Sequence, residues 1–173
     1  MPDALPTGPV AHSAAGPVGR GVRYGIDVGK ARVGVAKSDP DSLLATPVRT
    51  LKRDLKKRYE QTVLMRHLLE DEAVTVYVGL PHNLSGGHTP STQDALDYAA
   101  QLQELLAEAG SVAQVRMVDE RLTTVSAQRQ LHQNGLDTKA SRAVIDQAAA
   151  VAILQQALEV QKSQQRPAGL PLA

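Results

Sequence analysis

The sequence predicts one α/β domain, built as a mixed sheet with helices packed on it. Three extended segments come first, as in a three-strand meander, and helix–strand units follow them. The chain has 173 residues, which is close to the usual size of one domain. Hydrophobic residues make up 42% and charged residues 21%, so the chain has enough apolar material for a core.

The three N-terminal segments have the alternation and composition of strands. Residues 22–28 (VRYGIDV) alternate, a Gly–Lys pair turns the chain, and residues 32–38 (RVGVAKS) form the second strand. Residues 43–49 (LLATPVR) carry Pro47, which suits an edge strand because proline cannot donate to a neighbouring strand. These segments predict the meander.

Apolar residues at helical spacing alternate with apolar runs over the rest of the chain. Gly110 and the Asn134–Gly135 pair are natural helix stops. The predicted order is helix 54–71, strand 73–79, helix 92–109, strand 112–118, and helices at about 124–133 and 141–161.

Both ends of the chain lack this periodicity. Residues 1–20 are rich in Pro, Gly, Ala and Ser, so we expect a disordered tail, and we expect a flexible tail at residues 163–173. The folded domain is therefore predicted at residues 21–162. No apolar run is long enough to span a membrane, and the start has no secretory signal. The lack of a membrane span, of a secretory signal and of Cys together favours a cytoplasmic location.

Composition also excludes several kinds of site. The absence of Cys rules out thiolate metal sites and cysteine nucleophiles, and none of the five His is spaced like a zinc ligand. Four Tyr and no Phe or Trp argue against a module that stacks nucleic-acid bases on several aromatic rings.

Net charge is +1, but positive charge is concentrated in residues 49–58 (RTLKRDLKKR). This run is either a solvated helix face or a patch that contacts phosphates. The candidate phosphate contacts are Lys52, Arg53, Lys56, Lys57 and Arg58.

Asp27 is the first candidate catalytic residue. It lies near the end of the first predicted strand in GIDVG, where two glycines would let a substrate backbone come close. A simple turn-forming Asp–x–Gly segment is the alternative explanation.

Asp119 and Glu120 are the second candidate, in DERLTT directly after the last predicted strand. Ligands collect where the strands of an α/β sheet end. Alternation places the two side chains on opposite faces, so we expect one to enter a site and the other to bind Arg121 or water. Thr123 and Thr124 have a simpler explanation, as caps of the next helix.

Asp146 is the third candidate. It lies on the apolar stripe of the last predicted helix, together with Ala149, Ala150, Ile153 and Ala157. A carboxylate on a buried face must be paired, either with a metal ion or with an arginine.

The three acids can converge at one end of the sheet. Unpaired, they would repel one another, and two Mg²⁺ or Mn²⁺ ions would relieve that repulsion. Two such ions can activate water and stabilise the leaving oxygen in phosphodiester hydrolysis.

Five blocks carry a family resemblance, in family order and spacing. They resemble the YqgF family, also called RuvX. The blocks are GIDVGKARVGVAKSDP (25–40), LLATPV (43–48), VGLPHNLSGG (78–87), VDERLTTVSAQ (118–128) and IDQAAAVAILQ (145–155).

The resemblance implies a ribonuclease-H-like fold, related to the RuvC resolvases. It implies a metal-dependent nuclease acting on structured RNA in 5′-end maturation of pre-16S ribosomal RNA, or on a four-way DNA junction, as a monomer or homodimer. On matching positions it implies Asp27, Glu120 and Asp146 as catalytic metal ligands, with Asp119 a further candidate.

The resemblance also places Lys30, Arg32 and Arg121 near substrate phosphates. Two positions depart from the family pattern. Leu80–Pro81 stands where an acid often follows the fourth strand, and Ser85 stands where the loop often carries an acid.

Two other function classes remain. The strand–DxG–hairpin also resembles the phosphate-binding motif of actin-like ATP-binding proteins, but the chain is too short for the two domains that close over a nucleotide. The other is a non-catalytic binding or assembly factor that uses residues 49–58.

Overall fold

The computed structural model describes residues 18–83, 85–122 and 139–172, and it contains a six-stranded mixed sheet in the order β3-β2-β1-β4-β5-β6. The predicted mixed sheet is therefore confirmed. The predicted helix at 124–133 and most of the predicted tail at 1–20 lie outside the described residues. The elements are β1 (Arg23–Val28), β2 (Arg32–Ser38), β3 (Ala45–Lys52), α1 (Tyr59–Glu70), β4 (Thr75–Leu80), α2 (Pro90–Glu108), β5 (Gln114–Asp119), the 3-10 turn η1 (Glu120–Leu122), α4 (Lys139–Gln164) and β6 (Leu170–Pro171).

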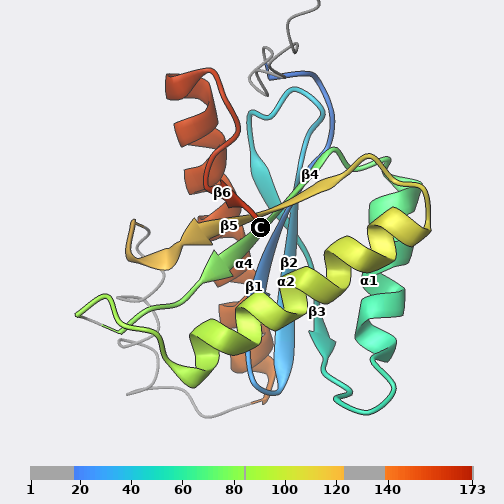
Figure 1. Cartoon of the computed structure of the whole chain (residues 1–173), viewed down its shortest axis with the longest axis vertical. Helices are drawn as coiled ribbons and strands as arrows, with labels where there is room; N and C mark the ends of the chain where they lie inside the picture. The colour runs from blue at the N-terminus through green and yellow to red at the C-terminus, as the bar shows by residue number, and fades with distance from the viewer. Residues whose placement is uncertain (1–17, 84, 123–138, 173) are drawn as a thin grey trace, which may run out of the picture.

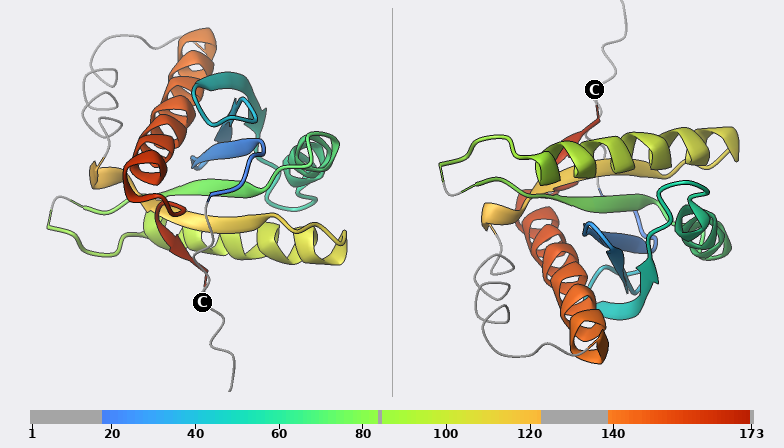
Figure 2. Two further views of the ribbon diagram at one scale, coloured as in Figure 1. Left: turned by 90° about the horizontal axis from the view of Figure 1, so that it is seen from above. Right: turned by 90° about the horizontal axis from the view of Figure 1, so that it is seen from below.

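Helices cover both faces of the sheet: α1 and α2 lie on one face and α4 on the other (Figures 1 and 2). Alternation along β1 divides its side chains between these layers. Tyr24 and Ile26 are fully buried in the core under α1 and α2. Gly25 faces α4, since a Cβ there would lie 2.6 Å from Cβ of Leu154. Asp27, two residues on, therefore also faces α4.

α4 packs closely on the sheet because small residues meet at the contact. The predicted apolar stripe is confirmed, since Ala149, Ala150, Ile153 and Ala157 are all buried. Gly34 of β2 lies so close to α4 that an added Cβ would overlap the backbone carbonyl of Asp146. Position 146 is thus held directly over β2.

One end of the sheet collects several chain segments. Strands β1, β4 and β5 are parallel, so their carboxyl ends meet at this edge. The β1–β2 hairpin lies there as well, and so does the end of β3, because Arg32 pairs with Lys52 (Figure 1). This edge is where the sequence places its candidate acids.

The basic run covers the end of β3 and the turn before α1, and it is not a helix face. Helix α1 begins at Tyr59, not at residue 54 as the spacing predicts. The Asp54 carboxylate accepts hydrogen bonds from the backbone N–H groups of Lys56 and Lys57, both at 3.0 Å, which fixes a turn there. The interpretation of the run as a solvated helix face is therefore wrong.

The structure also differs from the expected flexible tail at residues 163–173. β6 pairs antiparallel with β5 and closes the edge of the sheet. Arg116 of β5 fixes the segment just before β6, because its guanidinium donates to the carbonyls of Ala168 at 2.6 Å and Gly169 at 2.8 Å. Gly169 has φ +67°, a turn that favours glycine. These contacts join distant segments, so local composition does not reveal them.

Among the described residues, no helix is both long enough and apolar enough to cross a membrane.

Candidate active site

Asp27 lies near the carboxyl end of β1 and is only 2% exposed. On one side its partner in the sheet is Gly34 of β2. On the other side, one residue beyond the Ile26–Val78 pair, β4 places Gly79 at the same level. A carboxylate therefore stands between two positions that have no side chain.

Glu120 follows β5 directly and is 4% exposed. A Cβ on Gly79 would lie 2.6 Å from Oε1 of Glu120 and equally close to Cδ1 of Ile153. The Glu120 carboxylate therefore lies over Gly79, on the face of the sheet that α4 covers, which is also the face of Asp27.

Asp146 approaches the same region from α4. Its backbone carbonyl and its Cβ lie over Gly34, the sheet partner of Asp27. Its carboxylate forms an ion pair with Arg32, with 2.7 Å between Nε and Oδ2. The arginine partner that the sequence left open as an alternative is thus present.

Asp146 and Glu120 consequently lie over Gly34 and Gly79, the two positions that flank Asp27 at one end of the sheet. The three acids do not form a closed cage, because within the described ranges no group of three or more His, Cys, Asp or Glu side chains is placed to hold a metal ion. The donor set fits a hard divalent cation such as Mg²⁺ or Mn²⁺, since all the donors are carboxylates. The Arg32 guanidinium already places a positive charge beside the Asp146 carboxylate, and a metal ion bound there would do the same.

Asp119 points away from this group, as alternation along β5 predicts. Its carboxylate accepts hydrogen bonds from Nε of Arg121 at 3.0 Å and from Nη2 at 2.5 Å. The hydrogen bond from Arg121 holds the pKa of Asp119 below its usual range. Of the two adjacent acids, Glu120 is the one that faces Asp27.

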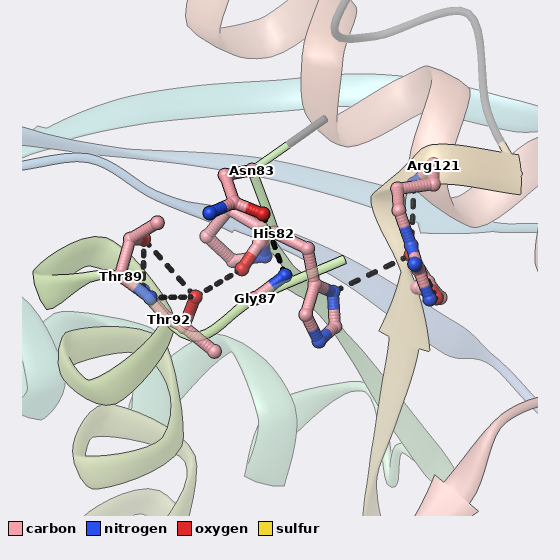
Figure 3. A network of polar contacts seen from close by, with 8 residues as sticks. His82, Asn83, Gly87, Thr89, Thr92 and Arg121 are labelled. Carbon is pink, nitrogen blue, oxygen red and sulfur yellow. Dashed lines mark hydrogen bonds and ion pairs between the residues drawn. The ribbon is translucent and has the colours of Figure 1, made fainter. Parts of the chain in front are cut away.

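A loop between β4 and α2 lies beside Arg121 (Figure 3), and its His82 contacts Asp119. Asn83 closes this loop, since its Oδ1 accepts from the backbone N–H of Gly87 at 2.5 Å. Thr89 and Thr92 form a capping box at the start of α2, and the Thr92 hydroxyl also donates to the carbonyl of Pro81. The loop is thereby tied to the helix.

His82 belongs to this loop and was missed by the sequence reasoning. Its Nδ1 lies 3.5 Å from Oδ1 of Asp119, and its side chain is 12% exposed. Its ring meets His88 edge to face, with 6.1 Å between the centroids. No local sequence signal marks it, because its neighbour Asp119 comes from another strand.

Six of the predicted phosphate-binding cations are exposed, and two are paired instead. The exposed ones lie in the hairpin, at the end of β3, in the turn before α1 and after β5: Lys30, Lys52, Lys56, Lys57, Arg58 and Arg121. Arg32 pairs with Asp146, and Arg53 is held by other residues. The Arg53 side chain is 8% exposed and binds Asp94 at 2.5 Å and the Gly29 carbonyl at 2.9 Å. It therefore holds the hairpin to α2 instead of facing solvent.

Comparison with known proteins shows the family of this chain. The model of the RuvX family, described as Holliday junction resolvase, matches residues 21–160. A protein of Mycobacterium tuberculosis (strain ATCC 25618 / H37Rv) is 55% identical over 141 residues, 82% of this chain and 80% of its own. A protein of Mycobacterium sp. (strain KMS) is 50% identical over 148 residues, 86% of this chain and 85% of its own. Both carry the name "Putative pre-16S rRNA nuclease".

A solved structure shares the fold. It is that of T. thermophilus RuvC in complex with Holliday junction substrate, with a TM-score of 0.56 and 16% identity. The match covers 87% of this chain and 99% of that chain. The ribonuclease-H-like fold that the resemblance implies is therefore confirmed.

Proposed function

The chain belongs to the RuvX family, and from that premise we propose that it is a metal-dependent nuclease that hydrolyses phosphodiester bonds of structured nucleic acid. The substrate we propose is the 5′ precursor of 16S ribosomal RNA, in the cytoplasm. Support for this substrate comes from the two mycobacterial relatives, whose names refer to pre-16S rRNA.

The observation that carries the proposal is the convergence of three acids from distant parts of the chain. Asp27 comes from β1, Glu120 from the end of β5 and Asp146 from α4, and all three adjoin Gly34 or Gly79. Asp27 and Glu120 are both almost fully buried, at 2% and 4% exposed. The two glycine positions let Asp146 and Glu120 come close to the sheet on either side of Asp27.

Asp27, Glu120 and Asp146 would hold Mg²⁺ or Mn²⁺. When bound, such ions lower the pKa of a water and stabilise charge on the leaving oxygen of a phosphodiester. The rest of the mechanism belongs to the chain's own cations. Arg121 after β5 and Lys30 of the hairpin are exposed near the strand ends that carry the acids, where they would bind the substrate backbone, and the exposed cations of the turn before α1 would extend that contact.

Asp146 has a second part in this mechanism. In the described structure its carboxylate is paired with Arg32. If Asp146 held a divalent cation, the Arg32 guanidinium would lose part of its partner and would be available for a phosphate. This ion pair would then link occupancy of the acids to binding of the substrate.

One gel tests the proposal. Purified protein with Mn²⁺ is offered a pre-16S 5′ precursor RNA and, separately, a four-way DNA junction. We expect cleavage of the RNA, and we expect Asp27→Asn to abolish it without loss of fold. The control is Asp97→Asn, which removes the same charge from the exposed surface of α2.

The outcomes separate the candidate functions. Cleavage of the junction alone would favour a resolvase, which the description of the family supports. Binding without cleavage of either substrate would favour an assembly factor. Cleavage by Asp27→Asn at the parent rate would contradict the proposed site.

A further inference from the structure

Asp119 and Arg121 form a fixed unit beside the three acids. Asp119 accepts from Nε and Nη2, so it takes up the side edge of the guanidinium. It also accepts from the backbone N–H of Arg121 at 2.9 Å, which fixes both ends of the contact. The Arg121 side chain is still half exposed, at 50%.

The loop between β4 and α2 restrains the same guanidinium from a second side. A Cβ on Gly86 would lie 2.5 Å from Nη1 of Arg121. Gly86 has φ +81°, and its N–H donates to the carbonyl of Asn83 at 2.9 Å, so the loop backbone is held in place. His82 of this loop also approaches Asp119, with 3.5 Å between Nδ1 and Oδ1.

Within the described residues, hydrogen bonds occupy only one edge of the guanidinium. Arginine has five N–H donors in a planar fork, and Asp119 uses the edge made by Nε and Nη2. In the part of the chain that the structure describes, Nη1 donates to no residue. A fork with one edge held by a carboxylate presents its other edge in a fixed orientation, which suits two oxygens of a phosphate.

We propose that Asp119 is a positioning residue, which orients Arg121 to bind a backbone phosphate of the substrate, and that it is not a metal ligand. This inference rests on the proposed function, since it assigns the substrate contact of that site. It also gives the two adjacent acids different roles. Glu120 lies over Gly79 and serves the metal, whereas Asp119 serves the phosphate.

Three variants test this assignment: Asp119→Asn, Arg121→Lys and Glu120→Gln. We measure KM and kcat on the precursor RNA, affinity for that RNA without metal, and the rise in melting temperature caused by Mn²⁺. The matched control is Asp41→Asn. Asp41 also pairs with an exposed arginine, since it lies 2.7 Å from Nε of Arg20, but at the opposite end of the sheet.

We expect Asp119→Asn and Arg121→Lys to weaken RNA binding and raise KM, each on the order of tenfold, because the bidentate geometry is lost. The value of kcat and the response to Mn²⁺ should stay near those of the parent. The double variant should be no worse than either single variant, since the two residues act as one unit. Glu120→Gln should instead lose both kcat and the response to Mn²⁺.

Two outcomes would overturn the assignment. Loss of the Mn²⁺ response in Asp119→Asn would make Asp119 a metal ligand. Unchanged RNA affinity in Asp119→Asn beside weakened affinity in Arg121→Lys would mean that Arg121 needs no support. If the parent protein fails to cleave, the proposed function fails, but RNA affinity without metal still decides the role of Asp119.

Discussion

Arg32 and Asp146 are 114 positions apart in the chain, yet Nε of Arg32 lies 2.7 Å from Oδ2 of Asp146. The two residues come from β2 and α4, which meet where Gly34 lets the helix approach. The ion pair therefore joins the candidate acids to the hairpin.

The first prediction concerns this pair. Arg32→Gln removes a cation that competes for the Asp146 carboxylate, so Mn²⁺ should bind more tightly. If the coupling is roughly 1 kcal/mol, the midpoint of a Mn²⁺ titration falls about fivefold. Melting temperature followed against Mn²⁺ concentration measures it. Arg49→Gln removes the same charge from the exposed face of β3 and is the control. Equal midpoints in Arg32→Gln and the parent would mean that Asp146 does not take part in binding the metal.

The second prediction concerns the exposed turn before α1. Changing Lys56, Lys57 and Arg58 to Gln should weaken binding of nucleic acid and flatten its dependence on salt. On duplex DNA the slope falls by about 0.9 for each phosphate that the protein no longer neutralises. The matched triple variant changes three exposed cations elsewhere on the surface: Arg66, Lys162 and Arg166. Binding measured at several salt concentrations should show a change in slope for the first triple variant only.

The third prediction distinguishes the two glycines beside Asp27. Gly34→Ala would force a Cβ against the backbone of α4, and the strain should cost about 1–3 kcal/mol of unfolding free energy. Gly79→Ala meets only the ends of the Glu120 and Ile153 side chains, both at 2.6 Å. These ends can move, so cleavage should fall more than stability does.

Urea unfolding and cleavage rates, measured on the same preparations, test this contrast. Gly19→Ala is the control, because no atom lies within 4 Å of an added Cβ there. Full cleavage by Gly79→Ala would show that the position of the Glu120 carboxylate is unimportant.

The fourth prediction concerns the dependence of stability on pH. Burial opposes ionisation of Asp71, but hydrogen bonds from Tyr24 and Lys37 outweigh it and lower the pKa of Asp71. A lowered pKa contributes stability that is fully present above the unfolded value, near 3.9. That contribution disappears as the pH falls through the lower pKa of the folded state.

Asp71→Ala should therefore cost about 1–3 kcal/mol at neutral pH, where it also leaves the buried Tyr24 hydroxyl without its carboxylate partner. The difference from the parent should shrink below about pH 3. Urea unfolding at pH 7 and at acid pH measures both values. A constant difference across this range would show that the effect comes from packing and not from charge.

Most of the sheet was predictable because its signals are local. Alternation revealed β1 and β2, and Pro47 indicated the edge position of β3, which lies at one end of the strand order. The apolar stripe of α4 placed Asp146 on the face toward the sheet. Alternation also separated Asp119 from Glu120.

The features that the sequence did not reveal depend on contacts between distant segments. In the sequence Arg53 is one more cation in a basic run. Its partner Asp94 lies in α2, which comes close to Arg53 only in the folded chain. His82 has no spacing that marks it, because its neighbour Asp119 comes from another strand. The helix starts only at Tyr59 because the Asp54 carboxylate accepts a hydrogen bond from the backbone N–H of Lys56, which fixes a turn before the helix.

Strand β6 has a consequence for how the protein can be handled. Arg116 and Gly169 hold it against β5, so the last residues cover N–H and C=O groups that would otherwise face solvent. A chain cut after residue 164 would expose that row, and exposed rows of this kind recruit strands from other molecules. Such a shortened protein should aggregate at concentrations where the full chain remains dispersed, and light scattering would detect the difference.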